Sequence, residues 1–252
     1  LGMLAGEFSS AFLSCFILAL RPDNKNFSIR RSLSCNKGLS IISLALPISL
    51  NRVCVSLIST VETIQLPRKL MISGLSTSEA LSVYGVFSGM AFPLIMFPSA
   101  LTSSVSSLLL PSVSELQAQG NNKRIRKTIY LTIGFCSLLG IMCFLFFFIF
   151  ADFIGELLFH SSIAASQIRA LSFVCPFLYL SGALCSILHG LGKTGITFAF
   201  NMISIFLRLG FVYFVIPLSG FSGYLYGILC SQILFDFLII LALKQYLIYD
   251  KM

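Results

Sequence analysis

The chain has 252 residues, of which 57% are hydrophobic and only 10% are charged. Soluble domains carry about 25% charged residues, so this chain has too few polar side chains to cover a surface that faces water. Intrinsic disorder, a disulfide scaffold and an ordinary cytosolic enzyme are therefore excluded, and an all-α integral membrane protein is expected.

Cysteine spacing and net charge favour neither a metal site nor nucleic-acid binding. The eight cysteines include no CxxC pair, and no Cys/His cluster has metal-ligand spacing, so we expect small apolar packing residues and no cofactor. The net charge of +8 is assigned to loops beside anionic membrane lipid. The chain begins at Leu1, and no basic segment precedes its first apolar run. We therefore expect a fragment of a longer protein and no signal peptide.

Seven apolar stretches are long enough to cross a membrane, since a transmembrane helix needs about 20 mostly apolar residues. They cover residues 1–20, 38–66, 80–110, 128–150, 165–189, 194–216 and 221–244. The second and third exceed the bilayer thickness, so we expect each to tilt, bend or project into water. Pro47, Pro93 and Pro98 are the expected places for a kink.

Two short segments between the spans have their own patterns. Residues 73–80 predict a turn followed by a helix start, with Ser76 or Thr77 as the cap and Glu79 in the first turn. Residues 151–160 predict a short amphipathic helix that lies along the outer membrane surface.

Basic residues are concentrated in alternate loops. Segments 21–37 and 111–127 carry Lys and Arg clusters, and further lysines lie at 193, 244 and 251. The opposite loops carry Arg68, Lys69 and Arg169. The positive-inside rule then places the first group of loops and the C-terminus in the cytoplasm, with Leu1 outside. The basic run at 121–127 is interpreted as a membrane anchor, with no nucleic-acid partner.

Polar residues form a stripe along the second span. Ser49, Arg52, Ser56, Ser59 and Thr63 are spaced by 3, 4, 3 and 4 residues, which puts them on one helical face. Counted from residue 40, Arg52 lies about 18 Å along the helix, near the bilayer midplane. A charge there costs at least ~2.5 kcal/mol, so we expect Arg52 to face a wet cavity that receives an anionic group. Glu7 is an alternative partner, whereas Glu62 is about 15 Å away along the axis and is expected near the outer mouth.

Three later spans carry polar stripes as well. The sixth has Thr194, Thr197, Asn201, Ser204 and Arg208 at spacings of 3 and 4, and the seventh has Gln232 and Asp236. The fifth has a weaker stripe of Arg169, Ser172, Pro176, Tyr179, Ala183 and Ser186. Hydroxyl stripes also occur where helices pack closely, and a structural Arg208–Asp236 pair is an alternative for those two charges. The candidate cavity residues are Arg52, Ser56, Ser59, Asn201, Ser204, Arg208 and Asp236.

No constellation of catalytic residues can be assembled from the sequence. GLGKTG at 190–195 is not a Walker loop, because that pattern needs glycine at position 187, where Ile187 stands. His160 and His189 are isolated, and no paired carboxylates or HExxH motif occurs. We therefore expect no enzyme and no catalytic residue.

Several long strings resemble a known family. They are SGLSTSEAL at 73–81, YGVFSGMAFPL at 84–94, MFPSALTSSVSSLLLPSVSE at 96–115 and ILHGLGKT at 187–194. Together they resemble the stage V sporulation protein B family of polysaccharide flippases, within the multidrug/oligosaccharidyl-lipid/polysaccharide exporter superfamily. The similarity covers about residues 38–244. It implies a MATE-like protein with two six-helix lobes around a central cleft.

The resemblance also implies a division of the chain. Residues 1–20 would be the last helix of the first lobe and 21–37 a cytoplasmic link. Residues 38–244 would be the six-helix second lobe and 245–252 a cytoplasmic tail. Most of the first lobe is absent, so the partner of this chain in the cleft would be that missing lobe of the full-length protein.

The implied function is movement of a lipid-linked oligosaccharide, such as a peptidoglycan precursor, across the cytoplasmic membrane by alternating access. A role in forming the spore cortex is implied as well. Arg52, with serine and asparagine groups, would replace part of the hydration of the anionic headgroup. The alternatives are a multidrug or organic-cation antiporter of the same superfamily, an inactive fragment, and a membrane-embedded transferase. The antiporter needs an acidic cavity, and the transferase needs an acid/base pair.

Overall fold

The computed structural model describes residues 35–249 and, before them, residues 6, 8–10, 12, 13 and 16. In the long range, side chains are described from 46 to 246. The chain divides into two compact units, Leu1–Ser43 and Leu44–Met252, and most of the described residues belong to the second. Most of the first predicted span and of the 21–37 link, together with Glu7, lie outside the described residues.

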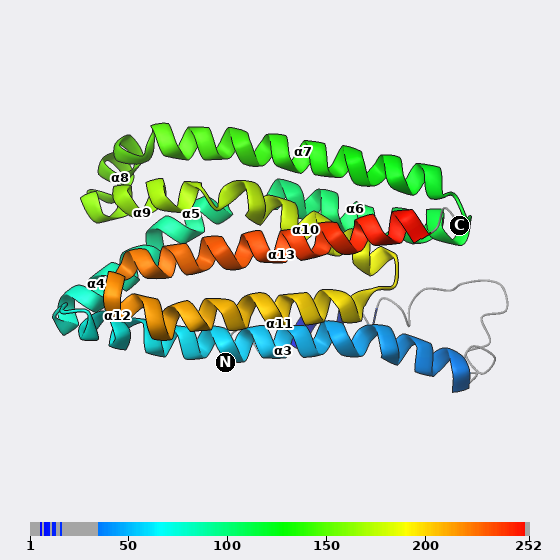
Figure 1. Cartoon of the computed structure of the whole chain (residues 1–252), viewed down its shortest axis with the longest axis horizontal. Helices are drawn as coiled ribbons and strands as arrows, with labels where there is room; N and C mark the ends of the chain where they lie inside the picture. Colours follow the sequence, from blue (N-terminus) through cyan, green and yellow to red (C-terminus); the bar gives the residue numbers. More distant parts are fainter. Residues whose placement is uncertain (1–5, 7, 11, 14–15, 17–34, 250–252) are drawn as a thin grey trace. The chain divides into compact units, whose positions relative to one another are not determined.

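From residue 35 on, the described part of the chain is built from helices joined by short turns (Figure 1). In chain order these are α3 (Cys35–Ile72), α4 (Thr77–Val86), the π-helical turn η1 (Phe87–Ala91), α5 (Phe92–Met96), α6 (Ser99–Ala118), α7 (Asn122–Ile149), α8 (Ala151–Phe159), α9 (Ser162–Ser172), α10 (Cys175–Gly190), α11 (Thr194–Gly210), the π-helical turn η2 (Phe211–Val215), α12 (Ile216–Ser219) and α13 (Phe221–Tyr249).

Four helical segments of the described residues are long and apolar enough to cross a membrane. They are Thr77–Met96, Asn122–Ile149, Thr194–Ser219 and Phe221–Tyr246, and the bent pair α9–α10 would make a fifth. These five correspond to the third to seventh predicted spans. Helix α3, the second predicted span, is not among them. The predicted all-α membrane fold is confirmed.

The third predicted span is divided in two at Pro98. Because proline has no N–H, the carbonyl of Leu94 instead accepts a bond from the N–H of Phe97, at 3.2 Å, and α5 ends there. The Ser99 hydroxyl donates to the carbonyl of Met96 at 2.6 Å, and the buried Tyr179 hydroxyl donates to the carbonyl of Ile95 at 2.6 Å. The predicted kink at Pro98 is therefore a complete break, and side chains satisfy its carbonyls. Helix α3, in contrast, continues through Pro47.

Replacing Tyr179 by phenylalanine is expected to destabilise the protein by about 1–3 kcal/mol, because the Ile95 carbonyl would lose its donor in a buried position. Thermal unfolding of the purified protein in detergent measures the loss. Tyr226→Phe is the matched control, since Tyr226 is 60% exposed on α13. Equal melting temperatures for both variants would mean that the Tyr179 hydroxyl does not stabilise the break.

The fifth predicted span, over residues 165–189, contains a break as well. Helices α9 and α10 meet at an angle of 52°, between Ser172 and Cys175. Pro176 explains the bend, because its ring clashes with the carbonyl four residues earlier, that of Ser172, and provides no N–H for it. The pair still passes as one possible span, but no kink was predicted within 165–189, so the bend was missed from the sequence.

Two short local predictions are confirmed. Ser76 is the N-cap of α4, and its side chain accepts a bond from the N–H of Glu79 at 3.3 Å, while the Glu79 carboxylate accepts one from the N–H of Ser76 at 2.9 Å. Residues Ala151–Phe159 form the short helix α8. It packs tightly on α9, since a Cβ at Gly155 would lie 2.5 Å from that of Ala165. Its place at the membrane surface stays a prediction.

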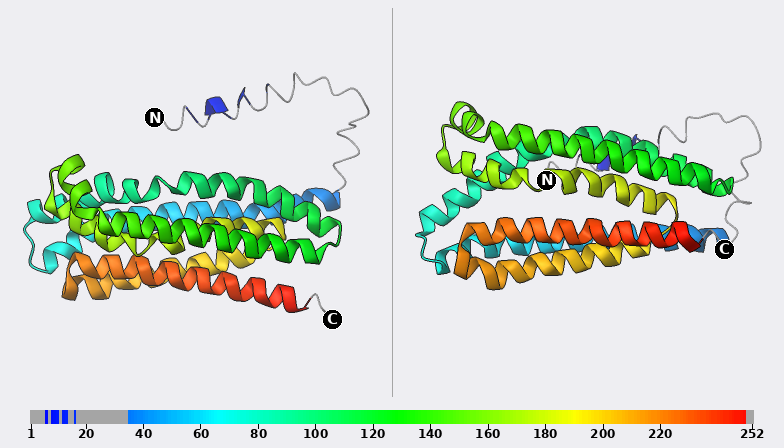
Figure 2. Two further views of the ribbon diagram at one scale, coloured as in Figure 1. Left: turned by 90° about the horizontal axis from the view of Figure 1, so that it is seen from above. Right: turned by 45° about the horizontal axis from the view of Figure 1, so that its top comes forward.

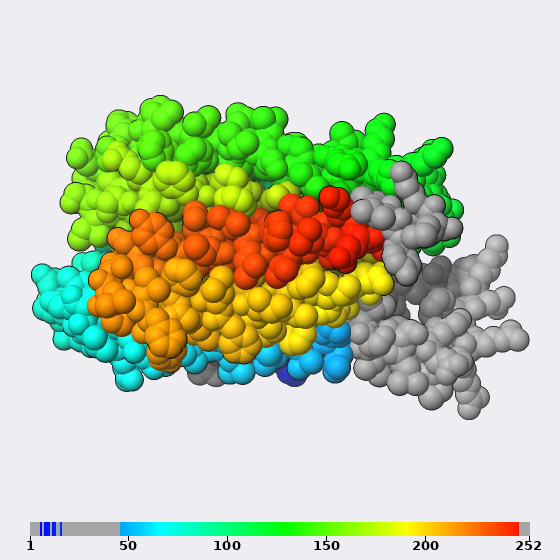
Figure 3. Space-filling model, viewed as in Figure 1, coloured from blue at the N-terminus to red at the C-terminus, as the bar shows by residue number. Residues whose placement is uncertain are grey.

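Helix α10 lies at the centre of the second unit and packs against α6, α7 and α13. Helices α11 and α13 lie side by side as an antiparallel pair (Figures 1 and 2). We call the two ends of this unit the Gly220 end, where α12 turns into α13, and the Gly192 end, where α10 turns into α11. Figure 3 shows the face that α7, α13 and α11 cover. Helices α11–α13 carry exposed Phe214, Leu218 and Phe237, as a lipid-facing surface requires.

The apolar core of this unit consists of two clusters. One, at the Gly220 end, includes Leu66, Phe87, Tyr179 and Tyr224, and the other, at the Gly192 end, includes Leu109, Ile125, Leu184 and Ile239. Buried polar side chains also occur in this unit, among them Thr102, Ser204, Ser231 and Asp236. A buried polar group is costly unless it is paired, so the surroundings of these side chains are where a site is expected.

Candidate functional site

Helix α3 presents three different faces along its described length. A docked face, which includes Asn51, Glu62, Leu66 and Leu70, is partly or fully buried. The predicted stripe of Ser49, Arg52, Ser56, Ser59 and Thr63, which we call the α3 polar stripe, is exposed throughout. A third face of exposed apolar residues includes Val53, Leu57 and Ile64. On a helix of 3.6 residues per turn the polar stripe lies between the other two faces, roughly 75° from the centre of the docked face and about 100° from the centre of the apolar face.

The docked face of α3 meets the polar stripe of α11. The amide nitrogen Nδ2 of Asn201 donates to Oδ1 of Asn51 at 2.7 Å, and Nε of Arg208 donates to Oε1 of Glu62 at 2.7 Å. The Arg208 side chain is 26% exposed and that of Glu62 only 7%. The predicted alternative of an Arg208–Asp236 pair is therefore wrong for this conformation, because Glu62 is the partner of Arg208.

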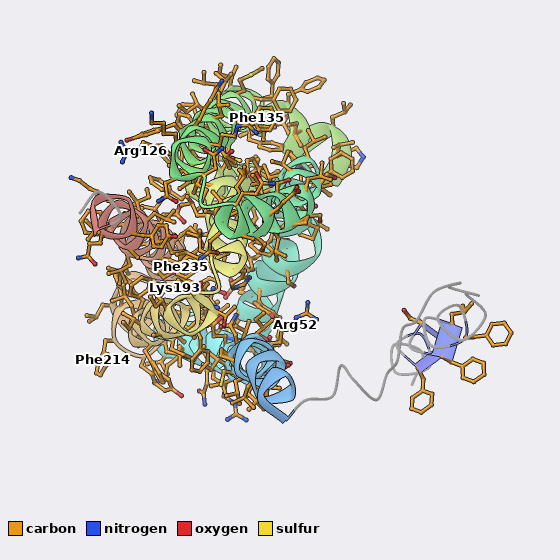
Figure 4. All side chains as sticks on the ribbon, turned by 90° about the vertical axis from the view of Figure 1, so that its right-hand side faces the viewer. Arg52, Arg126, Phe135, Lys193, Phe214 and Phe235 are labelled. Atoms are coloured by element: carbon orange, nitrogen blue, oxygen red, sulfur yellow. The ribbon has the colours of Figure 1, made fainter. Side chains whose placement is uncertain are left out.

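Arg52 is exposed on α3 and has no ion-pair or hydrogen-bond partner among the residues that the structure describes. The ion pairs found there join Arg169 to Asp152 and Arg208 to Glu62. Figure 4 places Arg52 at the edge of this unit, on the side away from Phe214. The guanidinium thus has its donors free for a group outside the described part of the chain. Glu7, the alternative partner, cannot be placed.

A groove lies between α5–α6 and α10. Its volume is about 600 Å³, and we call it the serine groove after its lining of Met96, Ser99, Thr102, Ser103, Ser106, Ser107, Leu110, Leu178, Ser181, Gly182 and Ser186. The hydroxyls of Ser103, Ser106 and Ser107 donate to carbonyls of their own helix at 2.8–2.9 Å. Each of these hydroxyls has thus donated its only proton within the helix, but its oxygen still has lone pairs. The groove therefore offers a ligand hydrogen-bond acceptors.

The α6 residues of this groove were not among the predicted site residues. Their signal was present in the sequence, because Ser99, Ser103 and Ser106 are spaced by 4 and 3 residues and form one helical stripe. On α10, Ser186 belongs to the weak stripe predicted for the fifth span, and Ser181 and Gly182 were not singled out.

A smaller cavity of about 240 Å³ lies between α10, α11 and α13, and we call it the α11 cavity. Its lining comprises Ser181, Gly182, Cys185, Asn201, Ser204, Ile205, Arg208, Ser231, Gln232 and Phe235. It shares Ser181 and Gly182 with the serine groove, so the two spaces adjoin at α10. Asp236 follows the lining residue Phe235, is 2% exposed, and neither of its carboxylate oxygens has a hydrogen-bond partner in the described part of the chain.

The predicted cavity residues therefore fall into two groups. Arg52, Ser56 and Ser59 lie on the exposed polar stripe of α3, while Asn201, Ser204 and Arg208 line the α11 cavity with Asp236 beside it. The Asn51–Asn201 bond connects the groups, because Asn51 precedes Arg52 and Asn201 lines the cavity. No group of three or more His, Cys, Asp or Glu side chains is placed to hold a metal ion within the described residues.

Comparison with known proteins identifies the family. The MatE family profile matches residues 37–214. Stage V sporulation protein B of Bacillus subtilis (strain 168) is 26% identical over 242 residues, which are 93% of this chain and 46% of that protein. Sporulation protein YkvU of the same organism is 25% identical over 177 residues, 69% of this chain and 39% of that protein.

The chain spans less than half the length of each of these relatives. No solved structure matches it significantly. The family profile, however, covers well over half of the chain, in a stretch that runs from α3 into η2. This multi-pass helical membrane protein therefore belongs to the MatE family.

Proposed function

We propose that this chain forms one lobe of a flippase that moves a lipid-linked oligosaccharide, such as a peptidoglycan precursor, across the cell membrane by alternating access. The observation that carries the proposal is Arg52, which is exposed, has no partner among the described residues and lies on a hydroxyl-bearing helical face. The sporulation names of both relatives support a role in spore formation, and we extend this to the spore cortex.

An arginine in this position fits an anionic headgroup. A guanidinium at membrane depth is costly unless it meets water or an anion, and here the rest of the lobe leaves it uncovered. Its planar set of donors matches two phosphate oxygens at once, whereas a lysine would act as a point charge. The α3 polar stripe would therefore hold the pyrophosphate while the polyprenyl tail stays in the bilayer.

The serine groove fits the sugar part of the same substrate. Its hydroxyls have used their protons on helix carbonyls, so they accept bonds from a ligand rich in O–H donors and offer little to a phosphate. Its volume of about 600 Å³ is within the usual range for a small-molecule site. Sugar and pyrophosphate would thus bind to different surfaces of the lobe.

Transport also requires a second surface opposite these two. Because the chain spans 46% of stage V sporulation protein B, we assign the opposing lobe to the remainder of the full-length protein. Rocking of the two lobes would expose Arg52 and the groove to each side in turn. In this arrangement the Gly192 end and the C-terminus are cytoplasmic, as the basic residues near them suggest.

A flipping assay distinguishes this function from export of organic cations. The full-length protein would be reconstituted into vesicles that contain a fluorescent polyprenyl-pyrophosphoryl sugar. A membrane-impermeant quencher would then be added, and the rate at which probe from the inner leaflet reaches the outer leaflet and is quenched would be followed. The proposal predicts faster flipping than in protein-free vesicles and no uptake of a lipophilic cation dye. Cation uptake without flipping would favour the antiporter, whose cavity should be acidic, although no acidic side chain lines the serine groove.

A further inference from the structure

A further cavity lies between α9 and α13, near the Gly220 end. Its volume is about 390 Å³, and we call it the α9–α13 groove after its lining of Ala170, Phe173, Ser222, Leu225, Tyr226 and Leu229. The four α13 residues stand at i, i+3, i+4 and i+7, so they share one helical face and extend roughly 10 Å along the axis. The groove therefore runs along α13, and its volume is within the usual range for a small-molecule site.

The bend between α9 and α10 creates this groove. Helix α10 packs against α13, whereas α9 packs against α7, α8 and η1. Since α9 and α10 meet at 52°, α9 leads away from α13 at the point where α10 begins. Ala170 and Phe173 lie on the α9 side of the bend and form one wall of the groove. The groove thus occupies the angle that the bend leaves between α9 and α13.

The walls of the groove are held in place by their own packing. The ring centroid of Phe173 lies 5.0 Å from that of Phe144 and 5.6 Å from that of Phe148, and both partners belong to α7. On the opposite wall, Leu225 and Leu229 pack against the apolar cluster at the Gly220 end. An apolar ligand would therefore enter a site that is already formed, and little ordering of side chains would oppose its binding.

The lining favours a hydrocarbon ligand. Among the described residues no charged side chain lines the groove, and its polar side chains are Ser222 and Tyr226. A mostly apolar cavity holds water poorly, because a bound water molecule needs two to four polar partners. Phe173 is 47% exposed and Tyr226 is 60% exposed, so both walls reach the surface of the protein. On membrane-spanning helices that surface meets acyl chains.

The groove lies on the side of this unit away from Arg52. Figure 3 looks onto the seam between α9 and α13, and Figure 4 shows α13 across the unit from Arg52. An opposing lobe that covers Arg52 and the serine groove would leave the α9–α13 side to the bilayer. The placement of that lobe rests on the proposed function, whereas the walls and lining of the groove do not. A lipid of the surrounding membrane is therefore the occupant that fits this position.

We propose that the α9–α13 groove binds one acyl chain of a bilayer phospholipid, and that this chain stabilises the bent arrangement of α9 and α10. The chain would provide the apolar contacts that α9 does not make with α13, and burial of its methylene groups would provide the binding free energy. A phospholipid held in this way should stay with the protein when the lipids that only cover its surface are washed away.

Photolabelling distinguishes such a bound lipid from the surrounding lipids. The purified full-length protein would be given a phosphatidylglycerol with a photoreactive diazirine on one acyl chain, washed extensively with detergent and irradiated. Retained label should map to Phe173 and to residues 222–229. Leu138 and Leu145 of α7 are the reference, since they are exposed and line none of the cavities described. Their label should disappear on washing. Equal loss of label from both surfaces would refute a specific site.

Two substitutions fill the groove from opposite walls. Ala170→Leu on α9 and Leu229→Phe on α13 each add carbon atoms to the lining. Each should lower the retained label by about 10-fold, which is the effect of losing about two buried methylene groups. Ala199→Leu is the matched control, because Ala199 is exposed on α11 and lines none of the cavities. Undiminished label in both groove variants would show that the lipid binds elsewhere and would refute the proposal.

Melting temperatures in detergent test the effect on the bend. Added phosphatidylglycerol should raise the melting temperature of the unmodified protein and of Ala199→Leu by at least about 2 °C, because it binds the folded state. The rise should be clearly smaller in Ala170→Leu, whose leucine already occupies part of the groove. An equal rise in all three proteins would contradict stabilisation through the groove.

Competition identifies the source of the chain. Unlabelled phosphatidylglycerol should displace the photolabel from the groove. Displacement by a polyprenyl phosphate, without displacement by phosphatidylglycerol, would assign the groove to the tail of the transported lipid and would overturn the choice of a phospholipid. None of these measurements follows transport, so the flipping assay and the lipid site can fail independently of each other.

Discussion

Replacing Arg52 by alanine in the full-length protein is expected to reduce transport of the lipid-linked sugar by about 100-fold or more, because the loss of a charged, bidentate contact to phosphate costs about 2–5 kcal/mol. The protein should still reach the membrane, since Arg52 makes no ion pair or hydrogen bond to other described residues that folding would lose. Flipping in reconstituted vesicles measures transport, and the melting temperature in detergent measures the fold.

Two further substitutions separate the position of Arg52 from its charge. Arg68→Ala is the matched control, because Arg68 is another exposed arginine of α3, and it should leave transport unchanged. Arg52→Lys should retain part of the activity, since lysine keeps the charge but not the planar pair of donors. Wild-type transport by Arg52→Ala would remove Arg52 from the mechanism and, with it, the main support for an anionic substrate.

The second large effect is expected at Gly182. This residue lines both the serine groove and the α11 cavity, so a leucine there would occupy space in each. A Cβ at this position would meet only Oγ of Ser106, at 3.7 Å, which is ordinary contact, and the helix would gain from losing a glycine. Gly182→Leu should therefore lower transport by about 10-fold or more, with little change in melting temperature. A 10-fold loss corresponds to a free-energy cost of about 1.4 kcal/mol.

Gly134→Leu is the control for this substitution. Gly134 is an exposed glycine within helix α7, and a Cβ there would meet nothing within 4 Å. The variant should fold and transport normally, because its new side chain would project away from both cavities. Normal transport by Gly182→Leu, at a normal melting temperature, would mean that the substrate does not use the serine groove.

Much of the architecture could be predicted because it depends on local physics. Apolar composition requires a lipid environment, and spacings of 3 and 4 residues define helical faces whatever the helix packs against. The α3 polar stripe was found in this way, and all of its members share one exposed face. The capping box at Ser76 and Glu79 was predictable for the same reason, since its partners are three residues apart.

The pairing of Arg208 could not be predicted, because it depends on how two helices are set against each other. Glu62 is 146 residues away in the chain, and the choice between Glu62 and Asp236 is fixed by the axial register and rotation of α3 and α11. The stripe of each helix is readable from the sequence, but that register is not. The α9–α10 bend is a different case, because a local residue, Pro176, accounts for it. It was missed because the residues around this proline form one continuous apolar run.

The most direct measurement of the central claim is the water accessibility of α3 in the full-length protein. Single cysteines would be placed along two exposed faces, at 52, 56 and 59 on the polar stripe and at 53, 57 and 64 on the apolar face, in a cysteine-free parent. Reaction with a hydrophilic thiol reagent that cannot cross membranes should be fast at the first three positions and slow at the other three. Slow reaction at all six positions, or a rate that only follows depth along the helix, would place Arg52 against lipid or protein. An aqueous, cationic binding surface on α3 could not then be maintained.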